Sequence, residues 1–412
     1  MAKPLANVKV LDLSRVLAGP FCTMILADLG AEIIKVEIPE GGDDSRHFGP
    51  FIDGKSLYFL SINRGKESLA LNLKTAEGKA LLKELAQKVD VLVENYRPGT
   101  MEKLGLGYDV LKAINPGLIY AAVSGFGHTG PDALKPAYDI LAQAMGGIMS
   151  ITGWPETPPT RVGMSLGDIT AALYAAIGIA TALYQRTVTG IGQKIDVAML
   201  DCQLAILENA LARFQVTGKS PEPLGNRHPT ISPFQAFKAK DKYFVMAIGN
   251  DALWKKFCEA VGRLDLIDAP DFATNHQRTE NIGKLAAVLE DIFRMQPAAY
   301  WLELLEQAAV PCGPINEIGE VMQNRQILAR NMIVEVADKT IGNVKVAGNP
   351  IKMTSIPEEP TRPAAPEIGA HSAKILTELL HLSQEEIADL KAKGVISNYK
   401  PENCDCSENK VQ

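Results

Sequence analysis

The sequence predicts an α/β protein with an open, mostly parallel sheet in a large domain and a second, smaller domain. Three observations support this prediction. Short apolar segments alternate with helical segments through the first 218 residues, a Pro- and Gly-rich stretch follows at 219–235, and the composition then shifts toward helices. An alternation of strands and helices is typical of a parallel sheet that is covered by helices.

The large domain can be followed element by element. We expect strands at residues 8–14, 31–37, 68–73, 89–96, 117–124 and 193–199. We expect helices at 20–30, 75–88, 101–104, 168–184 and 200–218. Gly30 is suited to end the first of these helices, and Thr75 is suited to cap the second. The helix at 168–184 is apolar and rich in small residues, which favours a buried helix over a membrane span.

The remaining chain is expected to form the smaller domain and then to return to the large domain. We assign 1–218 to the large domain, 219–235 to a linker, 236–330 to the small domain and 331–412 to a segment that completes the large domain. The small domain is expected to have a strand at 242–249 and helices at 252–262 and 300–308, and the return segment a helix at 372–380. The polar C-terminal tail is expected to be flexible, and Cys404 and Cys406 are read as part of it rather than as a metal or redox pair.

Composition excludes several classes of function. The chain has 412 residues, 46% of them hydrophobic, and its net charge of -6 gives no basic footprint for nucleic acid. The six cysteines are scattered and the N-terminus resembles no signal or transit peptide, so we expect a cytoplasmic protein without a membrane partner. The six histidines show no metal-binding spacing, and no metal is expected.

A glycine-rich loop follows the strand at 117–124. Residues 125–130 read G-x-G-x-x-G, the pattern of a dinucleotide-binding loop. Pro136 would break a helix within two turns of this loop, and no acidic residue lies about 20 positions further on, so NAD or FAD is not favoured. A plain turn and a ligand-binding loop at the end of a strand both remain open, with His128 as a loop residue or a catalytic group.

Asp168 lies between Gly167 and the long apolar helix. One interpretation is a helix N-cap, a position that aspartate fills well. The other is a nucleophile, because a helix N-terminus favours the ionised carboxylate and a neighbouring glycine lets a substrate approach closely. A well-placed carboxylate can form a covalent acyl intermediate.

Several segments together resemble one family. The segments "VLDLSRVLAGPFCTMILADLGAEIIKVE", "VENYRPGTMEKLGLGYDVL", "NPGLIYAAVSGFGHTGP", "GDITAALYAAIGIATAL" and "VPCGPI" are similar to class III CoA-transferases. This family includes formyl-CoA transferase, carnitine CoA-transferase and the α-methylacyl-CoA racemases. The resemblance implies a Rossmann-like large domain, a small α+β domain and two ring-like subunits that interlock as a homodimer.

The resemblance also implies a reaction. Asp168 matches the family's nucleophile, which exchanges CoA between an acyl-CoA and a free carboxylic acid through an aspartyl anhydride and an aspartyl-CoA thioester. CoA is then a substrate, and no permanently bound cofactor or metal is required. Gly167, Tyr138, Asp139 and Tyr58 match supporting positions. The positions assigned to CoA binding are Arg15, Val16, Leu17, Ala18, Leu71, Asn72, Leu73, Lys74, Asn95, Tyr96, Arg97, Lys103, Gly125 and Lys135.

The chain also departs from formyl-CoA transferase. Leu17 stands where that enzyme has glutamine, and no run of glycines follows residue 230, so formyl-CoA and oxalate are not the expected substrates. Residues 225–237 instead resemble members that use succinyl-CoA and small dicarboxylic acids. Two alternatives stay open: a racemase, although its pattern has histidine where this chain has Tyr138, and a CoA-binding protein without catalysis.

Overall fold

A computed structural model describes residues 3–397, which form two compact units. Unit 1 consists of residues 3–148, 162–208 and 325–397, and unit 2 of residues 149–161 and 209–324. Residues 209–235, which the sequence analysis divided between the large domain and a linker, therefore cluster with unit 2. The C-terminal tail with Cys404 and Cys406 lies outside the described residues.

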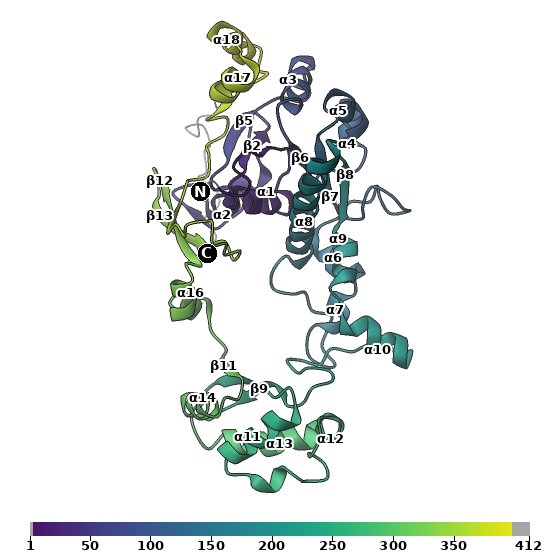
Figure 1. The fold of residues 1–412 in the computed structure, drawn as a ribbon, viewed down its shortest axis with the longest axis vertical. Helices are drawn as coiled ribbons and strands as arrows, with labels where there is room; N and C mark the ends of the chain where they lie inside the picture. The colour runs from purple at the N-terminus through teal and green to yellow at the C-terminus, as the bar shows by residue number, and fades with distance from the viewer. Residues whose placement is uncertain (1–2, 398–412) are drawn as a thin grey trace. The chain divides into compact units, whose positions relative to one another are not determined.

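Unit 1 is built on a six-stranded sheet whose paired strands are all parallel (Figure 1). The strands are β1 (Lys9–Asp12), β2 (Glu32–Glu37), β5 (Glu67–Ala70), β6 (Val91–Glu94), β7 (Ile119–Ser124) and β8 (Lys194–Ala198). Their spatial order is β5-β2-β1-β6-β7-β8. The third, second and first strands of this sheet are thus followed by the fourth, fifth and sixth, which is the Rossmann order. The predicted fold class is confirmed.

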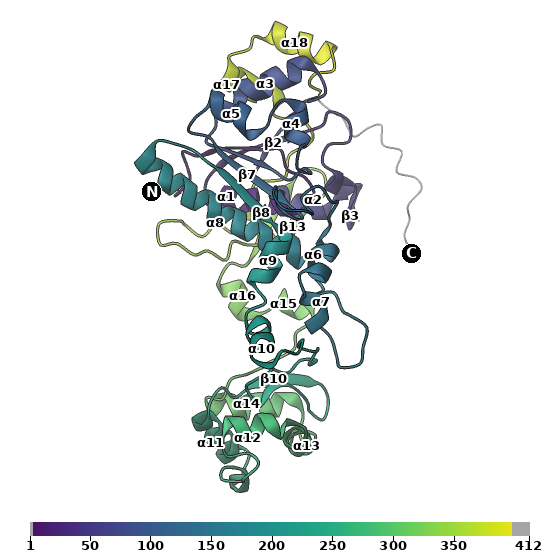
Figure 2. The same ribbon diagram turned by 90° about the vertical axis from the view of Figure 1, so that its right-hand side faces the viewer.

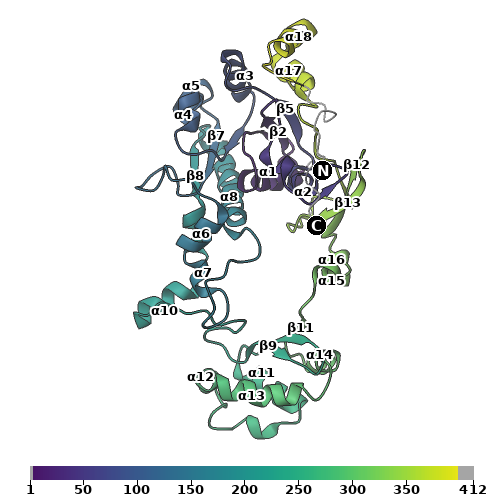
Figure 3. The ribbon, with the colours of Figure 1, turned by 180° about the vertical axis from the view of Figure 1, so that it is seen from behind.

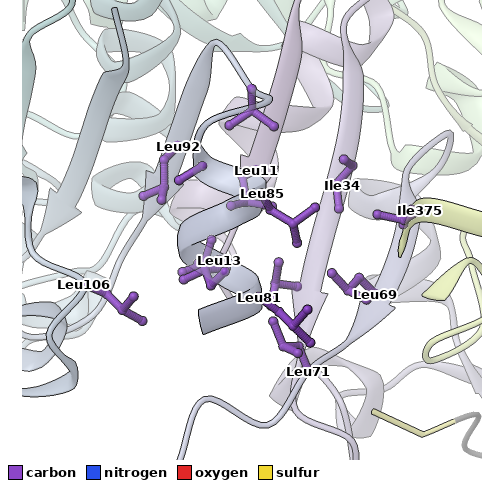
Figure 4. Close-up of a cluster of buried hydrophobic side chains, with 14 of the residues drawn as sticks. Leu11, Leu13, Ile34, Leu69, Leu71, Leu81, Leu85, Leu92, Leu106 and Ile375 are labelled. Atoms are coloured by element: carbon purple, nitrogen blue, oxygen red, sulfur yellow. The ribbon is translucent and has the colours of Figure 1, made fainter. Parts of the chain in front are cut away.

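Helices cover both faces of this sheet, because its strands are apolar on both sides. Val10 of β1 packs with α1 (Ala18–Asp28) and α8 (Leu166–Thr189). Leu11, the next residue, points to the opposite face and packs with α3 (Ala76–Ala86), as Figure 4 shows for Leu81 and Leu85. In Figure 2 α8 lies lengthwise beside β7 and β8.

The other elements of unit 1 are shorter. The helices are α2 (Leu57–Asn63), α4 (Thr100–Leu104), α5 (Tyr108–Ile114), α6 (Asp139–Met145), α9 (Met199–Ala205), α16 (Arg325–Ala329), α17 (Ser372–Leu380) and α18 (Gln384–Ala392), with a 3-10 turn η1 (Asp44–His47). A hairpin joins β3 (Phe51–Ile52) and β4 (Lys55–Ser56), and a second sheet has the order β13-β12-β14, with β12 (Ile333–Asp338), β13 (Gly342–Ala347) and β14 (Thr361–Arg362). A further short helix, α7 (Ile148–Ile151), lies where the chain leaves unit 1 and enters unit 2.

Local signals explain some of the helix starts and miss others. Thr75 caps α3 as predicted, because its hydroxyl accepts the Gly78 N–H at 3.0 Å. The N-cap interpretation of Asp168 is wrong: α8 begins at Leu166, Ser165 occupies the N-cap position, and Asp168 lies in the first turn. The predicted helix at 200–218 is two helices, α9 and α10 (Asn209–Thr217), and the chain between them contains Glu208 with φ +47°.

α8 is the one helix among the described residues that could span a membrane by length and composition. Half of its most apolar window is buried inside the structure. Ala171, Ala175 and Ile179 are buried against the sheet, whereas Ile177 and Val188 are exposed. The predicted buried helix is therefore buried along one face and carries apolar side chains on its exposed side.

Unit 2 combines a small antiparallel sheet with helices (Figure 3). Its strands are β9 (Phe234–Lys238), β10 (Tyr243–Ala247) and β11 (Cys312–Pro314), and its other elements are α11 (Asp251–Ala260), η2 (Leu264–Leu266), α12 (Asn275–Glu280), α13 (Ile282–Phe293), α14 (Ala298–Gln307) and α15 (Ile318–Val321). The core between sheet and helices is aromatic: the Phe293 ring packs with Phe237, Phe244 and Trp301. The α+β character of this unit agrees with the expectation, although β9 starts inside the predicted linker.

Candidate active site

The carboxyl ends of the parallel strands bring the predicted CoA-binding segments to one edge of the sheet. Residues 15–18 follow β1, 71–74 follow β5 and 95–97 follow β6. The strand order reverses between β1 and β6, and such a switch point is where open α/β sheets bind ligands. The side chain of Asn95 joins two of these segments, because it accepts the Arg15 N–H at 2.9 Å and donates to the Arg15 carbonyl at 2.7 Å.

The loop after β1 makes contacts with several other parts of unit 1. The Arg15 guanidinium lies 5.8 Å from the centre of the Tyr96 ring. Val16 has φ +66° and donates its N–H to Asp43 Oδ1 at 3.0 Å. Leu17 is buried in an apolar cluster with Met24 and Ile62, against which Val16, Tyr58 and Ile169 pack. Ala18 is the first residue of α1.

The other predicted CoA positions fall at the same edge or on the elements that follow it. Leu71 donates its N–H to the Glu37 carbonyl at 2.8 Å, and Asn72 donates to the Val395 carbonyl, which fixes the turn that carries Leu73 and Lys74. Lys74 and Arg97 are exposed, as is Lys103 on α4. Their cationic groups face solvent, where an anionic ligand could reach them.

Asp168 and Gly167 lie in the first turn of α8. A helix that connects two parallel strands runs antiparallel to them, so the N-terminus of α8 lies at the edge where β7 ends. The Gly167 N–H donates to Asp139 Oδ1 at 2.8 Å. A Cβ at Gly167 would lie 3.1 Å from that oxygen and 3.2 Å from Ala142 Cβ. Glycine therefore allows α6 and α8 to approach closely beside Asp168.

Asp139 is the first residue of α6 and is only 8% exposed. Its Oδ2 accepts a hydrogen bond from Gln143 Nε2 at 2.8 Å, and Gln143 Oε1 accepts the Val162 N–H at 2.9 Å. Both oxygens of Asp139 thus have donors, one of which is the backbone next to Asp168. Asp139 therefore holds the backbone at the start of α8 through the Gly167 N–H.

Tyr58 of α2 is electrostatically coupled to the same place. Burial raises the pKa of its phenol to about 12, and the negative charges of Asp168, Asp43 and Asp139 add to that rise. The phenol is therefore neutral at physiological pH and keeps its proton for hydrogen bonding. Tyr58, which the resemblance gives as a supporting position, thus lies within electrostatic reach of Asp168.

Three further predicted positions lie in the segment between β7 and α6. The Tyr138 side chain is 76% exposed, just before α6. Lys135 forms an exposed ion pair with Asp132 at 2.7 Å. A Cβ at Gly125 would lie 2.1 Å from Ala137 Cβ, so this glycine is needed for close packing of the loop on the segment before α6.

The glycine-rich loop is a turn that is held by side chains of β8. Gly127 and Gly130 have φ of +80° and +87°, and the next helix, α6, begins only at Asp139. The His128 N–H donates to Asp196 Oδ2 at 2.9 Å, and its Nδ1 lies 3.0 Å from Lys194 Nζ. This geometry lacks the immediate helix N-terminus that a dinucleotide pyrophosphate requires.

A buried network of charges around the loop after β1 was not predicted. Lys66 Nζ lies 3.0 Å from Asp12 Oδ2, and Lys35 Nζ lies 2.7 Å from Asp43 Oδ2, with all four side chains almost completely buried. The available signal was Lys35 inside the apolar segment 31–37, since a lysine is rarely buried without a partner, whereas Lys66 lies just before the segment 68–73. Among residues 3–397, no group of three His, Cys, Asp or Glu side chains is arranged to hold a metal ion.

Glu94 is a second buried charge that the sequence analysis missed. This last residue of β6 is 1% exposed, and its Oε2 accepts the Tyr96 N–H at 2.8 Å. Its Oε1 accepts from the Tyr120 hydroxyl at 3.3 Å and lies 3.8 Å from His128 Nε2. Burial raises the pKa of Glu94 to about 7, although the hydrogen bonds from Tyr96 and Tyr120 oppose that rise.

Comparison with known proteins identifies the family. The family model of CoA-transferase family III matches residues 5–372. An acetyl-CoA:oxalate CoA-transferase from Acetobacter aceti is 47% identical over 376 residues, which cover 91% of this chain and 95% of that protein. The human succinyl-CoA:glutarate CoA-transferase is 40% identical over 399 residues, which cover 97% and 91%.

Solved structures agree as well. The crystal structure of a CAIB/BAIF family protein from Brucella suis has a TM-score of 0.81 and 40% sequence identity, and the match covers 92% of this chain and 100% of that one. The fold, the family match and the identities lead to one conclusion: this chain is an enzyme of CoA-transferase family III.

Proposed function

We propose that the enzyme transfers CoA from an acyl-CoA donor to a small dicarboxylic acid, with Asp168 as the covalent nucleophile. The observation that carries this proposal is the position of Asp168 in the first turn of α8, beside the loop that follows β1. The positive end of a helix dipole favours an ionised carboxylate, and a carboxylate can attack a thioester.

The reaction balances without an external energy source. The Asp168 carboxylate attacks the thioester carbonyl of the donor and the C–S bond breaks, which gives a mixed acyl-aspartyl anhydride and a CoA thiolate. The thiolate then attacks the aspartyl carbonyl, which releases the donor acid as a carboxylate and leaves an aspartyl-CoA thioester. The acceptor carboxylate attacks this thioester and forms a second anhydride with release of the CoA thiolate. Attack of the thiolate on the acceptor's carbonyl gives the new acyl-CoA and restores Asp168.

Each of these attacks places negative charge on a carbonyl oxygen. Preorganised donors that point to such an oxygen stabilise the transition state. Tyr58 supports the proposal, because its phenol stays protonated and is coupled to the charge of Asp168. Asp139 holds the Gly167 N–H and so fixes the backbone that carries the nucleophile.

The CoA moiety would lie along the carboxyl edge of the sheet. Asn95 and Arg15 form the contact between the segments after β1 and β6, at the switch point. Exposed Lys74, Arg97 and Lys103 supply cationic groups for the phosphates of CoA. CoA enters this scheme as a substrate, and the scheme needs no permanently bound cofactor.

The names of the relatives guide the choice of substrates. They include succinyl-CoA:glutarate, succinyl-CoA:D-citramalate and succinyl-CoA:mesaconate CoA-transferases at 38–40% identity. The relative at 47% identity is an acetyl-CoA:oxalate CoA-transferase, so the earlier expectation against oxalate is not kept. We therefore propose succinyl-CoA or acetyl-CoA as the donor and a dicarboxylic acid of two to five carbons as the acceptor, in the cytoplasm.

A homodimer is the proposed assembly. The exposed side of α8 carries Ile177, Tyr184 and Val188, and α6 next to it exposes Ile140 and Met145. An apolar face of this kind is typical of a protein–protein interface. A second copy of the chain is the partner that the family resemblance implies.

A mass-spectrometric exchange screen tests the proposed reaction. Succinyl-CoA and acetyl-CoA are each paired with oxalate, malonate, succinate, glutarate, mesaconate and citramalate, and new thioesters are detected. The Asp168→Asn variant should lose activity by several orders of magnitude. The matched control is Asp201→Asn, because Asp201 is exposed and is the third residue of α9, as Asp168 is of α8.

Three outcomes would contradict the proposal. Exchange at a near-normal rate by Asp168→Asn would show that Asp168 is not the nucleophile. Deuterium uptake from heavy water at the α-carbon of a 2-methylacyl-CoA, without acid exchange, would instead identify a racemase. A protein that binds CoA but catalyses neither reaction would be a binding protein.

A further inference from the structure

The loop between β1 and α1 is held by side chains from several other elements. Asp12 Oδ1 accepts the Ser14 N–H at 3.0 Å, and Lys35 Nζ donates to the Ser14 carbonyl at 2.9 Å. Asn95 binds both the N–H and the carbonyl of Arg15. The conformation of this loop is therefore set by tertiary contacts rather than by its own sequence.

Val16 has an unfavourable backbone conformation. Its φ of +66° lies in the left-handed region, where a β-branched side chain is an outlier. Such strain persists only where the surrounding structure enforces it, and it is concentrated at functional sites. The enforcing contact is the hydrogen bond from the Val16 N–H to Asp43 Oδ1 at 3.0 Å.

Asp43 is fixed by its own neighbours. It caps η1, because its Oδ1 also accepts the Ser45 N–H at 2.9 Å and the Ser45 hydroxyl at 2.7 Å. Its Oδ2 lies 2.7 Å from Lys35 Nζ, and the exposed fractions of the Lys35 and Asp43 side chains are 0% and 1%. Burial alone would raise the pKa of Asp43, but the Lys35 charge and these hydrogen bonds keep it well below its usual range.

An ion pair buried this completely is weak support for stability, because desolvation offsets the attraction between its charges. Its geometric effect is specific, however. Lys35 donates to the Ser14 carbonyl and Asp43 accepts the Val16 N–H, so the pair fixes the backbone of the loop on both sides of Arg15. Leu17 belongs to the buried cluster with Met24 and Ile62, and Val16, Tyr58 and Ile169 all pack against that cluster. Ile169 follows Asp168 in the chain.

We propose that Lys35 and Asp43 are positioning residues, which hold Val16 in its left-handed conformation and thereby keep Val16 and Leu17 beside the start of α8. The inference rests on the proposed function of Asp168, because it assigns Val16 and Leu17, which the resemblance places among the CoA-binding positions, to the acyl side of that site, and leaves Arg15 on the CoA side. Arg15 stays bound to Asn95 independently of the pair. Loss of the pair should therefore impair acyl transfer more than it impairs CoA binding.

Asp43→Asn is the primary variant. If the side-chain oxygen of the new asparagine accepts the Val16 N–H, its NH₂ group faces the Lys35 ammonium, and two donors then face each other. If the side chain is flipped, the NH₂ group faces the Val16 N–H, which is also a donor. One of the two contacts is lost in either orientation. We expect kcat for the best donor–acceptor pair of the exchange screen to fall at least tenfold, with the Kd of free CoA changed less than about threefold.

A double-mutant cycle with Val16→Gly separates positioning from general destabilisation. Glycine adopts the left-handed conformation without strain, so it needs no enforcing contact. The cost of Asp43→Asn in kcat should fall to about threefold or less in the Val16→Gly background. The matched control is Asp28→Asn, which breaks another buried pair, Asp28 with Arg64 at 2.8 Å, and should show no coupling to Val16→Gly.

If Asp43→Asn does not fold, Lys35→Met/Asp43→Ala replaces it, because that variant leaves no unpaired buried charge. An equal loss of kcat in both backgrounds, or a loss confined to CoA affinity, would overturn the inference. The adduct at Asp168 in the wild-type enzyme is measured in parallel. Its absence would refute the nucleophile, whereas the coupling between Asp43 and Val16 is still read from CoA exchange.

Discussion

The buried carboxyl of Glu94 should make unit 1 less stable as pH rises. Glu94→Gln is the informative change, because the amide carbonyl can still accept the Tyr96 N–H and the amide nitrogen can donate to the Tyr120 hydroxyl oxygen. The shape and the turn after β6 are then retained, and only the ionisable proton is removed. Any pH dependence that differs between the two proteins belongs to Glu94.

The size of the effect follows from the pKa. Burial raises the pKa of Glu94 from its ordinary value of 4.5 to about 7. Between these values the native state binds more protons than the unfolded state, so the free energy of unfolding falls as pH rises. At about 1.4 kcal/mol for each pKa unit, the wild type should lose about 2.5 kcal/mol relative to Glu94→Gln between pH 5 and pH 8.

Hydrogen-exchange mass spectrometry in a urea series is the suitable assay, read on peptides that cover β6 and β7. Tryptophan fluorescence would report on unit 2 instead, because Trp154, Trp254 and Trp301 all lie there. Both proteins are compared at the same pH, so the intrinsic exchange rate cancels. A stability difference that is the same at pH 5 and pH 8, within about 0.5 kcal/mol, would show that Glu94 is not held with a raised pKa.

Three further predictions concern the site and the assembly. Gly167→Ala should lower the transfer rate at least tenfold, because the new methyl group presses on Asp139 and Ala142. The free energy of unfolding in urea should change by about 1 kcal/mol or less, since alanine favours helix. An unchanged rate would show that the close contact between α6 and α8 is not required. Leu17→Gln should cost about 1–3 kcal/mol in urea unfolding, because it places an amide in the cluster with Met24 and Ile62, and a cost near zero would contradict that packing. Light scattering after size-exclusion chromatography should give the mass of a dimer that persists on dilution, and a monomer at micromolar concentration would refute the proposed assembly.

The sheet was predictable because its signal is local. Each strand is a short apolar run between turn residues, and buried parallel strands are apolar on both faces. Helix boundaries were harder to predict. α8 begins two residues before Asp168 because the Gly167 N–H finds an acceptor on Asp139, a contact that no local pattern reveals. The break between α9 and α10 has neither glycine nor proline to mark it.

Some residues of the candidate site could likewise be predicted from the sequence, and others could not. Asp168, Tyr58 and the segments after β1 and β6 were identified by resemblance, and the structure brings the β1 and β6 segments together at the switch point. Lys35 and Asp43 were missed because a buried ion pair is defined by two partners from different elements. The lysine inside an apolar strand was the available signal, and it becomes meaningful only once its partner is known.

The covalent role of Asp168 is the central claim, and the mass of the protein tests it most directly. The enzyme is mixed with succinyl-CoA or acetyl-CoA, quenched in acid within its first turnovers, and analysed intact and after proteolysis. We predict a species heavier by one CoA less one water, mapped to the peptide that carries Asp168, present in Asp201→Asn and absent in Asp168→Asn. Rapid CoA exchange without such an adduct, or an adduct on any other residue, would contradict the account.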